Sequence, residues 1–122
     1  MASALPYQRP VDHAPREQTT INVTEDGPDA VLQVLSSETA RNILSVIAEE
    51  PATTSDIATT VDTSLQNAQY HLNHLQAADL VEAVETWYSA KGKEMTVYGV
   101  TTEELVVQFG DETTSSSQQH GG

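Results

Sequence analysis

The chain of 122 residues has no cysteine, only five basic residues and a single Phe. Without cysteine, it can form neither a disulfide framework nor a thiolate metal site, and it has no thiolate nucleophile. It also lacks long apolar runs, since no window approaches the roughly 18 apolar residues that a membrane helix needs, and no apolar signal core lies near its start. We therefore expect a soluble, cytoplasmic protein with no membrane partner.

Basic residues are scarce because 18 acidic residues oppose five Lys and Arg, which gives a formal net charge of −13. Such a surface can indicate an acidic tail, a partner with a basic face, or a protein that stays hydrated in molar salt. Through the predicted helices and strands the acidic residues are scattered, from Asp26 to Glu112, and they form no run of five or six like charges. Scattered acidity with few lysines and many Thr and Val resembles the proteins of extreme halophiles, so we expect a halophilic, haloarchaeal protein.

The chain leaves room for one small domain between polar ends. Residues 1–27 contain three prolines at positions 6, 10 and 15 and show no sustained periodicity, which predicts a flexible N-terminal arm with a brief extended piece over residues 20–24. Residues 111–122 are mostly Ser, Thr, Gln and Gly, which predicts a disordered C-terminal tail. The domain is therefore expected over residues 28–110.

Two helices are expected at the start of this domain. Pro28 suits the first position of a helix over residues 28–35. Ser36 or Ser37 can cap a second helix, which Pro51 ends. Its apolar residues recur at the spacing of one buried stripe: Ala40, Ile43, Leu44, Ile47 and Ala48.

A short helix, a tight turn and a longer helix follow, which is the layout of a helix-turn-helix. Thr54 or Ser55 can cap the short helix, and the turn is read at residues 62–64. The residues expected to face inward are Ile57, Ala58 and Val61 on the short helix, and Leu65, Ala68, Leu72 and Leu75 on the helix over residues 64–78.

The exposed face of this longer helix is rich in amides and almost free of charge. Its residues are Gln66, Asn67, Tyr70, Asn73 and His74. They are either neutral surface residues or readers of DNA bases, because amides pair with adenine edges and Tyr or His reaches bases and phosphates. The helix has no Arg or Lys, the usual partners of guanine, so the preferred site is expected to lean towards A·T pairs.

Residues 83–89 and 95–100 are rich in Val, Thr, Trp and Tyr and are joined through residues 90–94, which predicts a hairpin, or wing. The expected fold is therefore mainly α with a small β-hairpin (α+β), a winged helix-turn-helix. Lys91 and Lys93 at the tip either belong to a routine polar turn or contact DNA phosphates. Arg41 and Ser64 are further candidates for backbone contact.

The run from Ser37 to Glu82 resembles the winged helix-turn-helix of the ArsR-like superfamily of prokaryotic regulators. The likeness depends on Tyr70-His71-Leu72, then Leu75, then Leu80-Val81, and with the wing it covers about half of the chain. It implies a transcription regulator that binds double-stranded DNA as a homodimer. Relatives usually end the recognition helix with glycine, where this chain has Asp79.

After the wing, Thr101 and Glu104 have capping-box spacing, which predicts a short helix ending before Gly110. In proteins similar to this one, the first and last helices pair across a two-fold axis. The resemblance therefore implies a dimer interface, unless these side chains pack within one subunit: Val31, Leu35, Leu105, Val106 and Phe109.

Enzyme readings are weak. His71 and His74 stand three apart on the recognition helix, but no Cys or obvious third ligand completes a metal site. His71 is expected to pack at the edge of the core, and His13 and His120 lie in the predicted flexible ends. No phosphate loop or catalytic constellation can be placed. We expect no enzyme, metal or cofactor, and two hypotheses remain: a DNA-binding regulator, or a winged-helix module that binds another protein and not DNA.

Overall fold

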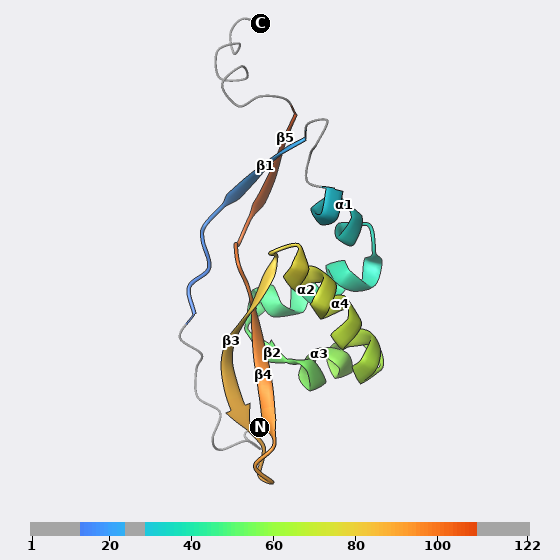
Figure 1. Cartoon of the computed structure of the whole chain (residues 1–122), viewed down its shortest axis with the longest axis vertical. Helices are drawn as coiled ribbons and strands as arrows, with labels where there is room; N and C mark the ends of the chain where they lie inside the picture. Colours follow the sequence, from blue (N-terminus) through green and yellow to red (C-terminus); the bar gives the residue numbers. More distant parts are fainter. Residues whose placement is uncertain (1–12, 24–28, 110–122) are drawn as a thin grey trace, which may run out of the picture.

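The computed structural model describes residues 13–23 and 29–109. Figure 1 shows the helices packed beside an antiparallel sheet, whose long hairpin extends away from a second, two-stranded ribbon. In chain order the elements are β1 (Thr19–Val23), α1 (Asp29–Leu35), α2 (Glu38–Glu49), β2 (Ala52–Thr53), α3 (Thr54–Thr60), α4 (Leu65–Ala77), β3 (Val81–Tyr88), β4 (Glu94–Val100) and β5 (Leu105–Phe109). The α3–α4 pair followed by the β3–β4 hairpin is a winged helix-turn-helix.

The first two helices confirm the sequence prediction. Ser37 caps α2, because its Oγ accepts a hydrogen bond from the backbone N–H of Ala40 at 3.2 Å. Ile43 and Ile47 are completely buried, whereas Ala48 is exposed, so its predicted place in the stripe is wrong. Ala48 lies eight residues after Ala40, and eight residues turn a helix about 80° beyond two full turns, so Ala48 is moved off the buried face.

The predicted cap of α3 is also wrong. Neither Thr54 nor Ser55 caps this helix; Thr53 does, with its Oγ1 accepting from the N–H of Asp56 at 3.2 Å. Thr53 belongs to the short strand β2, which pairs with β4 and buries this residue. The two-residue strand β2 has too little sequence to show a period, so the pattern did not reveal it.

The longer helix α4 begins as predicted, with Ser64 as its cap. Ala68, Leu72 and Leu75 are completely buried, but Leu65 is 58% exposed, so its predicted inward position is wrong. Leu65 is the first residue of the helix and is not among the side chains packed against the core.

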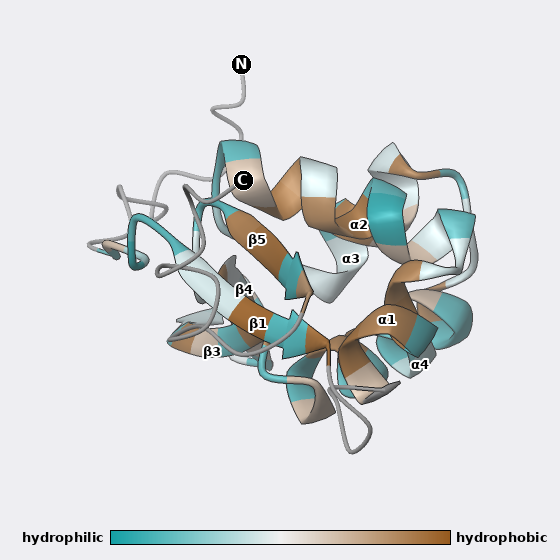
Figure 2. Ribbon diagram, turned by 90° about the horizontal axis from the view of Figure 1, so that it is seen from above, coloured by the Kyte–Doolittle hydropathy of each residue, from teal (hydrophilic) through white to brown (hydrophobic). Residues whose placement is uncertain are grey.

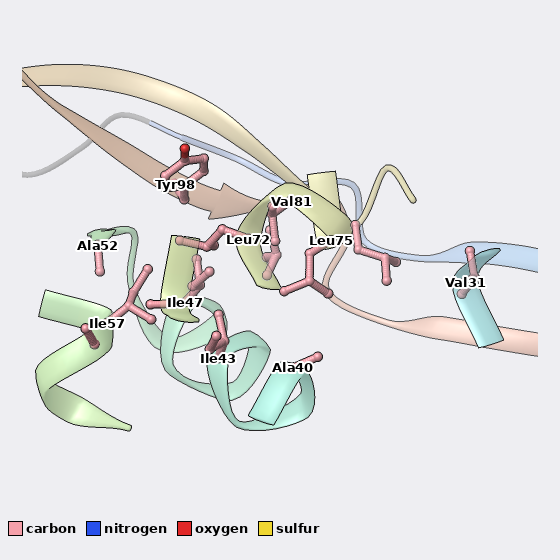
Figure 3. Close-up of a cluster of buried hydrophobic side chains, with 14 residues drawn as sticks. Val31, Ala40, Ile43, Ile47, Ala52, Ile57, Leu72, Leu75, Val81 and Tyr98 are labelled. Atoms are coloured by element: carbon pink, nitrogen blue, oxygen red, sulfur yellow. The ribbon is translucent and has the colours of Figure 1, made fainter. Parts of the chain in front are cut away.

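One apolar cluster joins all four helices to the sheet (Figure 3). Ile43 and Ile47 from α2 meet Ile57 from α3 and Leu72 from α4. Val81 and Tyr98 close the cluster from the strands. Figure 2 shows brown, apolar segments on α1 and α2 and on the neighbouring strands β1 and β5. Because several elements bury their apolar faces in this single core, the rotation of each helix about its own axis is fixed.

The predicted helix after the wing is wrong, because residues 105–109 form strand β5. β5 runs parallel to β1, with Thr19 opposite Leu105 and Val23 opposite Phe109. Thr101 cannot act as the predicted cap, since it is buried and its hydroxyl donates to the carbonyl of Asp79 at 2.8 Å. The Glu103 N–H bonds the Arg16 carbonyl, and Thr19 N–H bonds that of Glu104, which draws the chain into an extended path.

Part of the predicted N-terminal arm therefore packs with the domain. The extended piece expected over residues 20–24 agrees with β1 over residues 20–23, and position 24 lies outside the described residues. His13 also docks on the sheet, with its Nε2 2.8 Å from the Val100 carbonyl. The predicted tail over residues 111–122 lies outside the described residues, so the domain limits of 28 and 110 stay predictions.

The end of α4 forms at Asp79, which has the left-handed φ of 62°. The N–H of Leu80 bonds the carbonyl of Leu75 at 2.9 Å, which is the long-range bond of a glycine-type helix ending. An aspartate tolerates this conformation, although glycine adopts it at lower cost.

Replacing Asp79 with glycine should therefore raise the free energy of unfolding by about 1 kcal/mol. Urea denaturation in a fixed high-salt buffer measures the change. Asp79→Ala removes the same carboxylate but keeps a Cβ, so it should leave stability unchanged or lower it. If the alanine variant gained as much as the glycine variant, relief of charge repulsion and not of backbone strain would be the cause.

Candidate nucleic-acid interface

The polar face of α4 is exposed as the sequence predicts. Gln66, Asn73 and His74 are exposed, Tyr70 is 55% exposed, and Asn67 is half-buried. Their spacing places them on the side of α4 opposite its buried residues. The structure thus brings the five predicted base-reading residues onto one surface of one helix.

This surface lacks the acidity of the rest of the chain. Although the chain has 18 acidic residues, none lies between Asp62 and Asp79, which is its longest acid-free stretch. A shorter acid-free stretch, one of several in the chain, is residues 86–93, which cover the far end of β3 and the tip of the wing. The two segments expected to approach a polyanion are therefore spared the carboxylates that would repel it.

Hydrogen bonds fix several of these side chains before any ligand binds. His74 Nδ1 lies 3.0 Å from the Tyr70 carbonyl, which only accepts, so Nδ1 donates and Nε2 of the neutral ring remains an acceptor. The Tyr70 and His74 rings pack with their centroids 4.5 Å apart. Asn67 Nδ2 donates to Thr63 Oγ1 at 2.9 Å, which leaves its oxygen free. Gln66 makes no side-chain hydrogen bond within the described ranges.

Two residues near this face were not predicted as functional. Leu65 exposes an apolar side chain at the start of α4, and apolar side chains contact the methyl group of thymine. Gln69 is half-buried and bonds Asn73 on the same helix as well as Thr54 and Tyr98 on other elements. Helical periodicity did not assign either residue to the exposed polar face. Leu65 falls on the line of apolar residues, and Gln69 falls between that line and the polar face.

The wing tip presents its lysines without engaging them. Ser89 Oγ accepts from the N–H groups of Lys91 at 3.2 Å and Lys93 at 3.0 Å, and Gly92 turns the chain with a φ of 81°. Both lysine side chains are exposed, and neither forms an ion pair within the described part of the chain. The turn therefore holds two unneutralised cations at the end of the hairpin.

The other two backbone candidates have structural contacts. Arg41 Nη1 donates to the Leu35 carbonyl at 2.8 Å, which satisfies the end of α1. Ser64 Oγ accepts from the Asn67 N–H at 2.9 Å as the cap of α4. Arg41 is exposed beyond this contact, and Ser64 lies where backbone N–H groups of a helix start approach a phosphate.

The predicted dimer residues differ in burial. Val31 is buried in the core, and Leu35 and Leu105 pack against it, so these three make contacts within the subunit. Val106 is half-buried, whereas Phe109 is 80% exposed at the end of β5. Since residues 105–109 form β5, Leu105, Val106 and Phe109 lie on a strand and not on the predicted last helix.

The histidines do not converge on a metal site. His71 is half-buried, and its pKa is lowered by burial and, to a lesser degree, by the neighbouring His74. Over residues 13–23 and 29–109, no three His, Asp or Glu side chains gather closely enough to hold a metal ion. His120 lies outside these residues.

Over residues 13–23 and 29–109, no helix combines the length and apolarity that crossing a bilayer requires.

Residues 35–84 match a protein-family model described as a helix-turn-helix domain. The match spans α2, α3, α4 and the start of β3, and so includes the predicted recognition helix. Among curated proteins, none matches the chain.

Similar solved structures include the homodimeric winged helix-turn-helix DNA-binding domain of a possible ArsR-family regulator from Mycobacterium bovis, at 22% identity, 59% of this chain, 61% of that chain and a TM-score of 0.48. An ArsR-like transcriptional regulator from a Rhodococcus species is 30% identical over 60% of this chain and 63% of that one, also with a TM-score of 0.48. NolR from Sinorhizobium fredii is 18% identical, covers 75% and 76%, and scores 0.48. The chain thus spans about three fifths of the length of the first two.

The lowered pKa of His71 predicts a pH-dependent stability. The folded chain holds the His71 proton less tightly than the unfolded chain, whose value is about 6.5, so protonation favours unfolding. Stability should therefore fall as the pH drops below that value and level off below the folded pKa. Urea denaturation between pH 8 and pH 5 should show a smaller fall for His71→Gln than for the wild type. An equal fall in both proteins would assign the pH dependence to other groups.

Proposed function

We propose that this protein is a sequence-specific DNA-binding transcription regulator that places α4 in the major groove. The observation that carries the proposal is the surface of α4, which exposes amide, phenol and imidazole groups and no carboxylate in a chain of net charge −13. Neutral donors and acceptors on a helix suit base edges, which present both kinds of group in the major groove. A plain solvated helix of this chain would be expected to share its acidity.

In this proposal, contacts to the base edges specify the site and the wing positions the protein. Gln66, Asn67, Tyr70, Asn73 and His74 read bases, and Leu65 contacts a thymine methyl. Lys91 and Lys93 meet the phosphate backbone, assisted by Arg41 and by the start of α4 at Ser64. Gln69 Nε2 on α4 donates a hydrogen bond to Tyr98 Oη on β4 at 3.2 Å, so the reading helix is bonded directly to a strand of the wing.

The acidity of the remaining surface is compatible with this function in a concentrated salt solution. At molar ionic strength the Debye length falls to about 3 Å, so distant carboxylates no longer repel DNA. Local contacts at α4 and the wing then decide the affinity. The scattered carboxylates would meanwhile keep the surface hydrated, as expected for a halophilic protein.

We further propose a homodimer, in which the β1–β5 ribbon and α1 supply the interface. A two-stranded parallel ribbon leaves two backbone edges unpaired, and parallel strands are rarely left so exposed. The exposed apolar side chains here are Leu32, Val107 and Phe109. The buried oxygens of Asn22 and Gln108, which face each other in register, have no donor within the described residues. Two copies would present two α4 helices to a pseudo-palindromic operator.

A second candidate function is a winged-helix module that binds another protein. It is favoured by the net charge and by a surface hollow between α2, α3 and β3, whose lining includes Glu49, Glu50, Asp56 and Trp87. Such a hollow would accept a basic partner. Winged helices serve both purposes, so the fold does not choose between them.

The double substitution Lys91→Ala and Lys93→Ala separates the two functions. If the wing holds DNA, its affinity should fall at least about tenfold in moderate salt, and the slope of log affinity against log salt should decrease by about 0.9 for each lost phosphate contact. Fluorescence anisotropy with a labelled operator measures both quantities. Binding of a protein partner should be largely unaffected.

Arg16→Ala is the matched control, because it removes a cation from the arm near β1 and not from the wing. It should change affinity much less than either single lysine substitution. Equal losses from Arg16 and the wing lysines would show that only total charge matters, and the wing would have no specific role.

The dimer is tested by Phe109→Asp. Because Phe109 is 80% exposed in one subunit, the change should not unfold the chain, but it should convert a dimer to a monomer. Sedimentation equilibrium in molar salt measures the mass. Tyr88→Asp alters an aromatic residue of similar exposure, 57%, on the wing and should leave the dimer intact. A dimer that survives Phe109→Asp would place the interface elsewhere.

A further inference from the structure

Gln69 is the centre of a hydrogen-bond network that ties three elements together. Its Oε1 accepts from Thr54 Oγ1 at 3.0 Å, at the start of α3. Its Nε2 donates to Tyr98 Oη at 3.2 Å on β4 and to Asn73 Oδ1 at 3.0 Å, one turn further along α4. The amide of Gln69 therefore has its oxygen and both its amide protons engaged.

Two of the three partners of Gln69 belong to well-packed parts of the fold. Tyr98 is buried, with 7% of its surface exposed, and Thr54 is half-buried at the helix-turn-helix. Gln69 itself is half-buried between them, whereas Asn73 is exposed on the reading face. Through Gln69, the network therefore links the exposed side chain of Asn73 to the buried Tyr98.

The consequence for Asn73 is a fixed orientation of its amide. The bond from Gln69 turns Oδ1 of Asn73 back towards position 69, so the Nδ2 group lies on the opposite side of the amide, and it has no partner within the described residues. Adenine is read by an asparagine whose oxygen accepts from N6 while its nitrogen donates to N7. Guanine instead presents two acceptors, N7 and O6, which suit a side chain that offers only donors.

We infer that Gln69 is a positioning residue that holds Asn73 as a donor-only reader, and thereby selects guanine over adenine at the base pair that Asn73 contacts. The inference rests on the proposed DNA-binding function. It also changes one expectation from the sequence, since a free amide at position 73 would favour adenine. Asn67 is held through its Nδ2 with its oxygen free, and Gln66 makes no side-chain hydrogen bond within the described residues, so both keep their predicted lean towards A·T pairs.

The substitution Gln69→Glu should reverse the orientation. A carboxylate can accept from Thr54 and Tyr98 but cannot donate to Asn73 Oδ1, so Asn73 should turn its Nδ2 towards position 69 and its oxygen outward. Gln69→Met has a similar length and no hydrogen-bonding group, so it should release the amide. Gln76→Met is the matched control on the same helix, because Gln76 is exposed and makes no side-chain hydrogen bond within the described residues.

Base preference is measured by competition with labelled duplexes that carry each of the four base pairs at one position. That position is the one whose preference disappears in Asn73→Ala. The wild type should prefer guanine there by roughly tenfold, in the range of one good base contact. Gln69→Glu should shift the preference to adenine, Gln69→Met should flatten it, and Gln76→Met should leave it unchanged. These are ratios of affinities for one variant, so a general loss of stability or of charge attraction does not produce the switch.

Combining Gln69→Glu with Asn73→Ala should abolish the switch, because Gln69 acts through Asn73. A wild type that prefers adenine at this position, or a Gln69→Glu variant that keeps the guanine preference, would overturn the inference.

A measurement without DNA separates this inference from the proposed function. In the free protein, side-chain amide exchange followed by nuclear magnetic resonance should be slower for Gln69 than for Gln76, because both Gln69 protons are bonded. Exchange as fast as that of Gln76 would refute the network whether or not DNA binds. Protection of Gln69 in a protein that binds no DNA at any salt concentration would retain the network, but would overturn both the regulator and the reading role of Asn73.

Discussion

The burial of one side of α4 is the constraint on which the rest of the structure depends. Leu72 and Leu75 are completely excluded from solvent among residues of α2, α3 and the sheet, so α4 cannot rotate about its axis without exposing them. The opposite side is consequently fixed outward with its amides and aromatic groups. Ser64 begins the helix and Asp79 ends it, so the length of the exposed surface is set as well. The same packing that stabilises the domain therefore presents the proposed reading surface.

Charge is distributed so that this surface differs from its surroundings. Asp62 and Asp79 flank α4, but no acidic residue lies between them. The helix also contains no Lys or Arg, so in the proposed complex it would hold DNA through hydrogen bonds and shape, with the long-range attraction confined to the wing. Contacts of that kind depend on orientation more than on salt concentration. An interface made in this way is suited to a solution in which ionic attraction is weak, and it makes the orientation of each amide important.

The sequence predicts the parts of the fold that have a strong period or a strong cap. The helices α1 to α4, the turn at residues 62–64, the hairpin and the left-handed residue Asp79 are all readable from spacing and local chemistry. The sequence does not reveal β2 or β5, because a two-residue strand has no period and Leu105 to Phe109 become a strand only by pairing with a segment more than eighty residues away. The predicted cap at Thr101 fails for the same reason, since its hydroxyl is bonded to Asp79 across the fold. Helical spacing finds the exposed side of α4, but it cannot show that Asn73 is held by Gln69, which requires Thr54 and Tyr98 to be in place.

The most direct test of the central claim is fluorescence anisotropy with a DNA fragment from upstream of the protein's own gene, in potassium chloride stepped from tenths molar to several molar. The account predicts binding that persists in molar salt and that unlabelled specific DNA displaces far better than DNA of unrelated sequence. A folded protein that binds no fragment at any salt concentration, or that binds all sequences equally and only at low salt, would contradict it.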